Sequence, residues 1–221
     1  MKKAYVSHTG FGVDVASNRA DDLDTLLLEA IEQQSAPSVL DLAAGAGGQA
    51  LRMAAVGGQV TCVDAHDFSK QFDESIKASS MCAGNAQFVQ ADMLDFVQQF
   101  GKEFDFVLFQ RALHYVSYAV AQEMLHILST KTRQQLYISV SGLESAIAEY
   151  YSCRSRGIEE RFCFLTVEGR ELFQMHKPVC LYSHAEFTQL LRLSGWDINT
   201  CWQSAFGNHK AICSPIAASI D

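Results

Sequence analysis

The chain has 221 residues, a hydrophobic fraction of 48%, a charged fraction of 19% and a net charge of −8. A chain of this length buries roughly 70–75% of the surface that it exposes when unfolded, so disordered, collagen-like and miniprotein classes are excluded. The acidic balance opposes contact with a phosphate backbone, and the basic residues form no run. We expect a single compact domain over residues 1–221 with no nucleic-acid partner.

The cysteines and the amino-terminal residues indicate the compartment. The seven cysteines are odd in number and no two are closer than ten residues, so neither a CxxC pair nor a local zinc site is predicted. We interpret them as reduced, mostly buried thiols. The residues after Lys3 lack the apolar run of a signal peptide, and no uncharged apolar stretch reaches the length of a membrane span. A cytoplasmic protein with no metal site and no membrane contact is expected.

Helical and strand patterns alternate over the first two thirds of the chain. Apolar residues at helical spacing predict helices at 20–33, 49–56, 68–82, a short segment ending near 100, and 116–128. Short apolar runs predict strands at 38–43, 59–63, 87–90, 104–109 and 135–140. Strands this apolar, separated by helices, are typical of a parallel sheet that is covered on both faces.

The last third departs from this alternation. Residues 142–181 mix aromatic and charged side chains without a clean period, and we interpret them as an insertion that forms either a lid over the site or a homodimer interface. The capping-box sequence Ser183–Glu186 begins a helix that stops at Gly195. Two final strands, at 196–202 and 209–213, predict an antiparallel hairpin. The predicted fold class is therefore α/β, with a seven-stranded, mostly parallel sheet.

A glycine-rich loop follows the first strand. Glycine at positions 45 and 47 lets bare backbone approach a ligand, and the helix that follows points free N–H groups toward it. The loop also fits the dinucleotide pattern G-x-G-x-x-A, and Asp64 lies nineteen residues beyond Gly45, close to the spacing of an acid that binds ribose. The alternative is a tight turn without a ligand.

Asp41, inside the first strand, favours a cationic ligand. A buried carboxylate costs several kcal/mol unless it is paired or hydrogen-bonded. A pyrophosphate would add repulsion, whereas an ammonium or sulfonium group would reduce the cost. The sequence therefore favours a cationic cofactor over a nicotinamide dinucleotide.

Four motifs in order resemble those of the class I S-adenosylmethionine-dependent methyltransferases. They are Val39–Gly47, Val60–Asp64, Phe88–Met93 and Phe104–Tyr115. The resemblance covers about residues 36–141 and 183–213, and it implies the three-layer Rossmann-like fold of that family. One departure is Ala43, which stands where the family motif has its first glycine. Its methyl group is tolerable if the backbone there avoids a positive φ.

The resemblance implies a cofactor site for S-adenosylmethionine along the carboxyl ends of the first four strands. Asp41 would anchor the methionine amine, Gly45 and Gly47 would provide closely approaching backbone, and Asp64 would accept hydrogen bonds from both ribose hydroxyls. The alternative is that Asp64 caps a helix near His66. The same loops add three further positions to the predicted cofactor site: Ala43, Ala46 and Ala65.

The third and fourth motifs complete the predicted cofactor site. Asp92 would accept from the adenine amino group, with the N-cap of a helix as its alternative role, and Met93 would contact the ring. Gln110 would meet the methionine end, with Arg111 beside it. Arg19 is placed either at the cofactor carboxylate or at the surface.

Methyl transfer needs the acceptor held in line with the sulfonium carbon, and an acceptor of high pKa also needs a base. His114 is the candidate base because an unperturbed imidazole titrates near neutral pH; packing at a helix start is its alternative. The expected reaction is methylation of a small molecule. The alternatives are a nicotinamide-dependent oxidoreductase and a cofactor-binding subunit without an acceptor pocket. Asp105 is expected to be a solvated acid outside the site.

Overall fold

The computed structural model describes residues 10–11, 21–79 and 85–217. Its centre is a seven-stranded sheet in the order β3-β2-β1-β4-β5-β7-β6. The first five strands are parallel, and β7 pairs antiparallel with both β5 and β6. The strands are β1 (Ser38–Leu42), β2 (Gln59–Asp64), β3 (Ala86–Gln90), β4 (Phe104–Gln110), β5 (Thr132–Ser141), β6 (Trp196–Gln203) and β7 (Asn208–Pro215). The predicted mostly parallel sheet with a terminal hairpin is confirmed.

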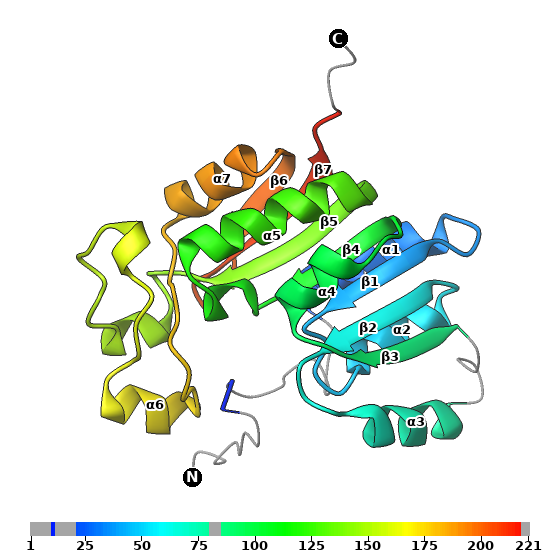
Figure 1. Ribbon diagram of the computed structural model, residues 1–221, viewed down its shortest axis with the longest axis horizontal. Coiled ribbons are helices and arrows are strands. Elements are labelled where there is room, and N and C mark those ends of the chain that lie inside the picture. Colours follow the sequence, from blue (N-terminus) through cyan, green and yellow to red (C-terminus); the bar gives the residue numbers. More distant parts are fainter. Residues whose placement is uncertain (1–9, 12–20, 80–84, 218–221) are drawn as a thin grey trace.

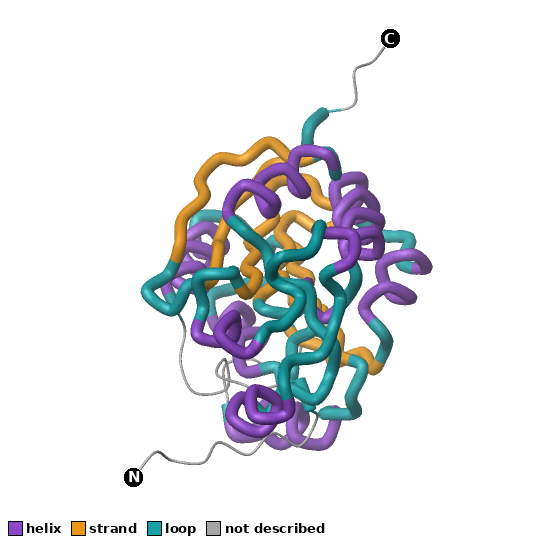
Figure 2. The backbone as a smooth tube through the Cα atoms, turned by 90° about the vertical axis from the view of Figure 1, so that its left-hand side faces the viewer, coloured by secondary structure: helices purple, strands orange, loops and turns teal. Residues whose placement is uncertain are grey.

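Helices cover both faces of the sheet (Figures 1 and 2). One hydrophobic cluster packs the strands against α1 (Asp22–Glu32), α2 (Gly48–Ala55) and α3 (Ser69–Ala78). The other cluster packs the opposite face against α4 (Met93–Gln99), α5 (Tyr118–Lys131) and α7 (His184–Leu193). Because the sheet is covered on both sides, its central strands are mostly apolar, which is the pattern that the sequence showed.

The element boundaries follow local signals. Ser183 accepts from the backbone of Glu186, and Glu186 accepts from the backbone of Ser183, so the predicted capping box begins α7. A second capping box, between Asp21 and Asp24, begins α1 and was not predicted. The largest boundary difference is at α3, which ends at Ala78 where a helix to residue 82 was expected.

The strand order reverses direction at the carboxyl edge of the sheet, between β1 and β4. After β1 the chain turns toward β2, whereas after β4 it turns toward β5, so the loops that follow these two neighbours diverge. Open α/β sheets bind ligands at such a switch point. Asp41 pairs with Leu108, so the ends of β1 and β4 lie side by side.

The insertion at 142–181 lies beside this carboxyl edge (left in Figure 1). It contains the short helices η2 (Ala146–Tyr150), η3 (Ile158–Glu160) and α6 (Val167–Phe173), and it has a small hydrophobic cluster of its own. A two-pronged ion pair, with both nitrogen–oxygen distances at 2.7 Å, joins Arg161 of the insertion to Glu186 of α7.

The prediction that all cysteines are reduced is wrong for one pair. Cys153 and Cys163 form a disulfide within the insertion, with their Cα atoms 6.6 Å apart. The spacing of ten residues excludes a local motif but not a pair that the fold of the insertion brings together. Disulfides are uncommon in the cytoplasm, so this bond differs from the reduced state expected there. Among the helices in the described ranges, none combines the length and the apolar character that a bilayer crossing requires.

The expectation that Asp105 is a solvated acid is also wrong. Its two carboxylate oxygens accept from Arg133, at 2.9 and 3.0 Å, and Ser38 donates to it from both backbone and side chain at 2.8 Å. Burial opposes ionisation, but these hydrogen bonds outweigh it and lower the pKa of Asp105 to about 2. Asp105 lies near the amino end of β4, so its exclusion from the predicted site agrees with its position.

Candidate functional site

The loop after β1 follows a left-handed backbone path. Ala43, Gly45 and Gly47 have φ values of +59°, +57° and +79°. The condition set for Ala43, that its backbone avoid a positive φ, is therefore not met. A left-handed alanine costs roughly 1–2 kcal/mol, which the surrounding loop must offset.

Gly47 is required by packing against α3. A Cβ at this position would lie 2.5 Å from the ring of Phe72, closer than real atoms approach. The Cβ direction of Gly47 thus faces a helix, and the approach of its backbone to a ligand stays a prediction. Ala46, between the two glycines, is partly exposed on the same loop.

Asp64 ties the loop to the end of β2. One carboxylate oxygen accepts from the backbone N–H of Gly45 at 2.8 Å, and the other accepts from that of His66 at 2.9 Å. The alternative, that Asp64 caps a helix near His66, is wrong, because α3 begins at Ser69 with Phe68 as its N-cap. Each oxygen keeps a further lone pair, so the carboxylate retains room for ribose hydroxyls. Ala65, the next residue, is exposed.

Asp41 is 4% exposed near the carboxyl end of the central strand β1, where it pairs with Cys62 of β2 on one side and Leu108 of β4 on the other. Burial and the neighbouring Asp41 raise the pKa of the Cys62 thiol, which stays protonated. The structure therefore places a carboxylate directly below the glycine-rich loop, as predicted.

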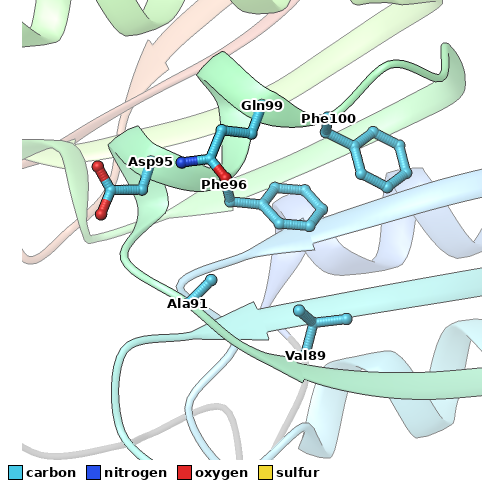
Figure 3. Close-up of a pocket in the computed structure, with 6 residues that line it drawn as sticks. All are labelled: Val89, Ala91, Asp95, Phe96, Gln99 and Phe100. Carbon is cyan, nitrogen blue, oxygen red and sulfur yellow. The ribbon is translucent and has the colours of Figure 1, made fainter.

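Asp92 is the N-cap of α4. Its side chain accepts from the backbone of Leu94 at 2.8 Å and of Asp95 at 3.4 Å, so the capping alternative is confirmed, and Met93 begins the helix. A cavity of about 260 Å³ opens between α4 and the edge strand β3, as Figure 3 shows. Six residues line this cavity, and none of them is a predicted site residue: Val89, Ala91, Asp95, Phe96, Gln99 and Phe100.

Gln110 lies at the end of β4 in a polar cluster that the sequence did not indicate. Its amide nitrogen donates to Asp24 at 2.6 Å and to Asp21 at 3.2 Å, both in the capping box of α1. Asp24 is 2% exposed, and burial raises its pKa to about 6. Lys210 of β7, also buried, forms an ion pair with Asp21 at 2.6 Å.

Sheet register explains why this cluster forms at one level. Gln110 pairs with Ser139 of β5, Ser139 with Lys210, and Lys210 with Trp202 of β6. The first turn of α1 crosses this row, and Asp22 accepts from the indole N–H of Trp202 at 2.8 Å. The aspartates near residue 21 resemble an ordinary helix start in the sequence. Only a helix-capping pattern would have singled them out.

Arg111 and His114 follow Gln110. Arg111 has a left-handed backbone with φ of +51°, and its Nε is buried without a hydrogen bond among the described residues. His114 is 2% exposed, and its Nδ1 is likewise buried and without a partner there. Burial, together with the neighbouring Arg111, lowers the pKa of His114 to about 3, so the imidazole is neutral at pH 7.

Phe11, near the amino terminus, contacts the insertion and two loops at the carboxyl edge. Phe11 forms a β-bridge with Met175 of the insertion, and its carbonyl accepts from the Tyr115 hydroxyl. The ring of Phe11 contacts the ring of Tyr115 edge-on, with the ring centroids 4.9 Å apart. It also contacts the ring of His66, with a centroid distance of 5.7 Å. The insertion and the loops after β2 and β4 are thus joined across the site. The prediction for Arg19 lies outside the described residues.

Residues 39–134 match a family model described as a methyltransferase domain. The match begins in β1 and ends within β5, so it includes the glycine-rich loop and the ends of the first four strands. No curated protein matches the chain. The match covers less than half of the chain, and it agrees with the family resemblance noted in the sequence.

Solved structures share the fold at low sequence identity. An S-adenosylmethionine-dependent methyltransferase from Methanosarcina mazei has a TM-score of 0.66 and 16% identity, over 84% of this chain and 95% of that one. A second structure is the 1,6-didemethyltoxoflavin-N1-methyltransferase of Burkholderia thailandensis with 1,6-didemethyltoxoflavin and S-adenosylhomocysteine bound. Its TM-score is 0.65 and its sequence identity 16%, over 91% of this chain and 79% of that one. The magnesium protoporphyrin IX methyltransferase of Synechocystis, with S-adenosylmethionine bound, has a TM-score of 0.59 and 16% sequence identity, over 86% of this chain and 76% of that one. These similarities confirm the Rossmann-like methyltransferase fold.

Proposed function

We propose that this protein transfers a methyl group from S-adenosylmethionine to a small-molecule acceptor. The observation that supports it best is Asp41, a carboxylate with 4% exposure below a left-handed loop in the region that matches the methyltransferase domain. A cationic amino-acid tail compensates such a charge, whereas a pyrophosphate would add repulsion. The similar structures with bound S-adenosylmethionine or S-adenosylhomocysteine support the same cofactor.

The residues at the strand ends carry the hydrogen-bonding groups that this cofactor needs. Asp64 offers free lone pairs beside the Gly45 N–H, which suits a ribose, and Asp92 is exposed at the start of α4, where the adenine would lie. Gln110 lies beside the end of β1 and would meet the methionine tail. The cofactor supplies an electrophilic methyl group, so the protein's task is to bind, to orient the acceptor and to exclude water.

The insertion supports a small acceptor, and the net charge of −8 disfavours a nucleic acid. The insertion has its own apolar cluster beside the carboxyl edge, and Phe11 joins it to the loops of the site. Such a cover suits a small, partly apolar molecule. His114 is the proposed proton acceptor, since its imidazole is neutral and its Nδ1 has no hydrogen-bond partner among the described residues. The magnesium protoporphyrin and toxoflavin enzymes are methyltransferases whose acceptors are small molecules.

A thermal-shift comparison tests the cofactor. S-Adenosylhomocysteine at 100 times its dissociation constant should stabilise the fold by about 2.7 kcal/mol, whereas NADH should not change the melting temperature. Stabilisation by NADH alone would contradict the proposal. Transfer of radiolabel from methyl-labelled cofactor into fractions of a metabolite extract would then identify the acceptor.

A further inference from the structure

Gln110 has a single group left to offer a ligand. Its amide nitrogen carries two hydrogens, and it donates to two carboxylates, those of Asp24 and Asp21. The opposite amide orientation would turn the carbonyl oxygen toward both carboxylates. Gln110 is partly exposed, so a ligand at the carboxyl edge can reach it. The group that it presents there is its carbonyl Oε1, which only accepts hydrogen bonds.

The carboxylates that impose this orientation are themselves held in place. Asp24 accepts from the backbone N–H of Asp21 at 2.8 Å, and Asp21 accepts from that of Asp24 at 3.2 Å. Lys210 donates to the other oxygen of Asp21 at 2.6 Å. Both acids are therefore fixed by the first turn of α1 and by β7, and neither can turn away from Gln110 without losing these bonds.

The chemistry of the cluster selects the kind of group that Gln110 binds. An acceptor oxygen needs a partner that carries N–H or O–H. Two carboxylates, those of Asp21 and Asp24, lie directly against the amide of Gln110, and at this distance they disfavour a ligand carboxylate and favour an ammonium group. Gln110 lies beside the end of β1, where the methionine tail of the proposed cofactor would lie.

We propose that Asp24 is a positioning residue that orients the amide of Gln110, so that its Oε1 accepts from the α-ammonium group of the cofactor. The inference rests on the proposed function. It assigns a role to a residue of α1 that lies outside the four methyltransferase motifs, and it makes Asp24 act only through Gln110.

Calorimetry with two ligands tests the role. S-Adenosylhomocysteine has the α-ammonium group, whereas 5′-methylthioadenosine has the same nucleoside and thioether without the amino-acid tail. The variant Asp24→Asn keeps the size of the side chain but allows the amide of Gln110 to turn over. It should weaken S-adenosylhomocysteine about tenfold, as expected for one hydrogen bond to a charged group, and change 5′-methylthioadenosine by less than about twofold. Equal weakening of both ligands, or of neither, would overturn the proposal.

A matched control and a double variant separate orientation from charge. Asp22→Asn removes a carboxylate from the same helical turn, but Asp22 contacts Lys210 and Trp202 and not Gln110. It should change both affinities by less than about twofold. In a Gln110→Met background, Asp24→Asn should have no further effect on S-adenosylhomocysteine. The same loss in both backgrounds would show an effect of charge alone and would overturn the proposal. Failure of the wild-type protein to bind S-adenosylhomocysteine would instead contradict the proposed function.

Discussion

The backbone N–H of Gly45 donates to the carboxylate of Asp64 at 2.8 Å and so joins the glycine-rich loop to the end of the neighbouring strand. The two residues are separated by 19 positions in the chain, and the bond places the predicted ribose-binding acid against the predicted close-approach backbone. Loop and acid therefore form one unit, and a change at either residue affects both.

Replacing Asp64 by Ala should weaken binding of S-adenosylhomocysteine by about 1–3 kcal/mol, because charge-assisted hydrogen bonds to the ribose are lost. Calorimetry measures the affinity. Asp67→Ala is the matched control, since Asp67 is an exposed acid of the same loop whose carboxylate, among the described residues, accepts hydrogen bonds only from Ser69. Equal affinities in wild type and Asp64→Ala would remove Asp64 from the cofactor site.

Replacing Ala43 by Gly should stabilise the protein slightly. Removal of the left-handed strain gains roughly 1–2 kcal/mol, and the more flexible unfolded chain costs about 0.4–1 kcal/mol, which leaves about 0.5–1 kcal/mol in favour of glycine. Urea denaturation measures this difference. At Ala44, the next residue, φ is not positive, so Ala44→Gly should destabilise by about 0.5–1 kcal/mol. A loss of stability in both variants would contradict strain at Ala43.

His114→Gln should slow methyl transfer by about a hundredfold and leave cofactor affinity unchanged. Because burial lowers the pKa of His114 to about 3, the imidazole stays neutral above pH 5, and the wild-type rate should show no acid limb near pH 6.5. A pH–rate profile with an identified acceptor measures both points. Full activity in the variant would assign His114 to packing alone.

The protonation of Asp24 should make stability depend on pH. Its pKa is raised from 3.8 in the unfolded chain to about 6 in the folded protein, so the folded state binds more protons between these values. Its contribution to stability is present below about pH 4 and is lost as the pH rises through 6, by roughly 3 kcal/mol in all. Asp24→Asn should therefore gain stability relative to wild type between pH 4.5 and pH 7.5 in urea titrations.

The matched variant at Asp22 should show no such dependence in this pH range. Burial opposes ionisation of Asp22, but its bonds to Lys210 and Trp202 outweigh it and lower its pKa below 3.8. Its contribution to stability is therefore complete above about pH 4 and is lost only as the pH falls below that value, so the curve of Asp22→Asn should run parallel to that of wild type between about pH 4.5 and pH 7.5. Parallel pH curves for wild type and Asp24→Asn would contradict the raised pKa of Asp24.

Removal of the disulfide should loosen the insertion. A closed loop with a separation of 10 residues contributes roughly 2–3 kcal/mol by restricting the unfolded chain. Replacing Cys153 and Cys163 together by Ser should lower the free energy of unfolding by that amount, and reductant should have the same effect on wild type but none on the double variant. Alkylation of both cysteines before reduction, detected by mass spectrometry, would show that the bond is absent.

The sequence alone determined the sheet, the order of its elements and the loop after β1. These features follow from local patterns: apolar period, glycine content and an acid at the end of a strand. The motif residues Asp41, Asp64 and Gln110 lie at the carboxyl edge as predicted, because parallel strands all end on the same side of their sheet.

Only the tertiary structure decided which side chains hold these residues in place. Asp24 lies 86 positions from Gln110 and Lys210 lies 189 positions from Asp21, so no local pattern links them. Their contacts depend on how the first turn of α1 packs against neighbouring residues of β4, β7 and β6. The left-handed backbone of Ala43 and the pairing of Cys153 with Cys163 likewise depend on the paths that the folded loops take. Sequence periodicity reports which face of an element is buried, whereas packing between distant elements decides which polar groups meet.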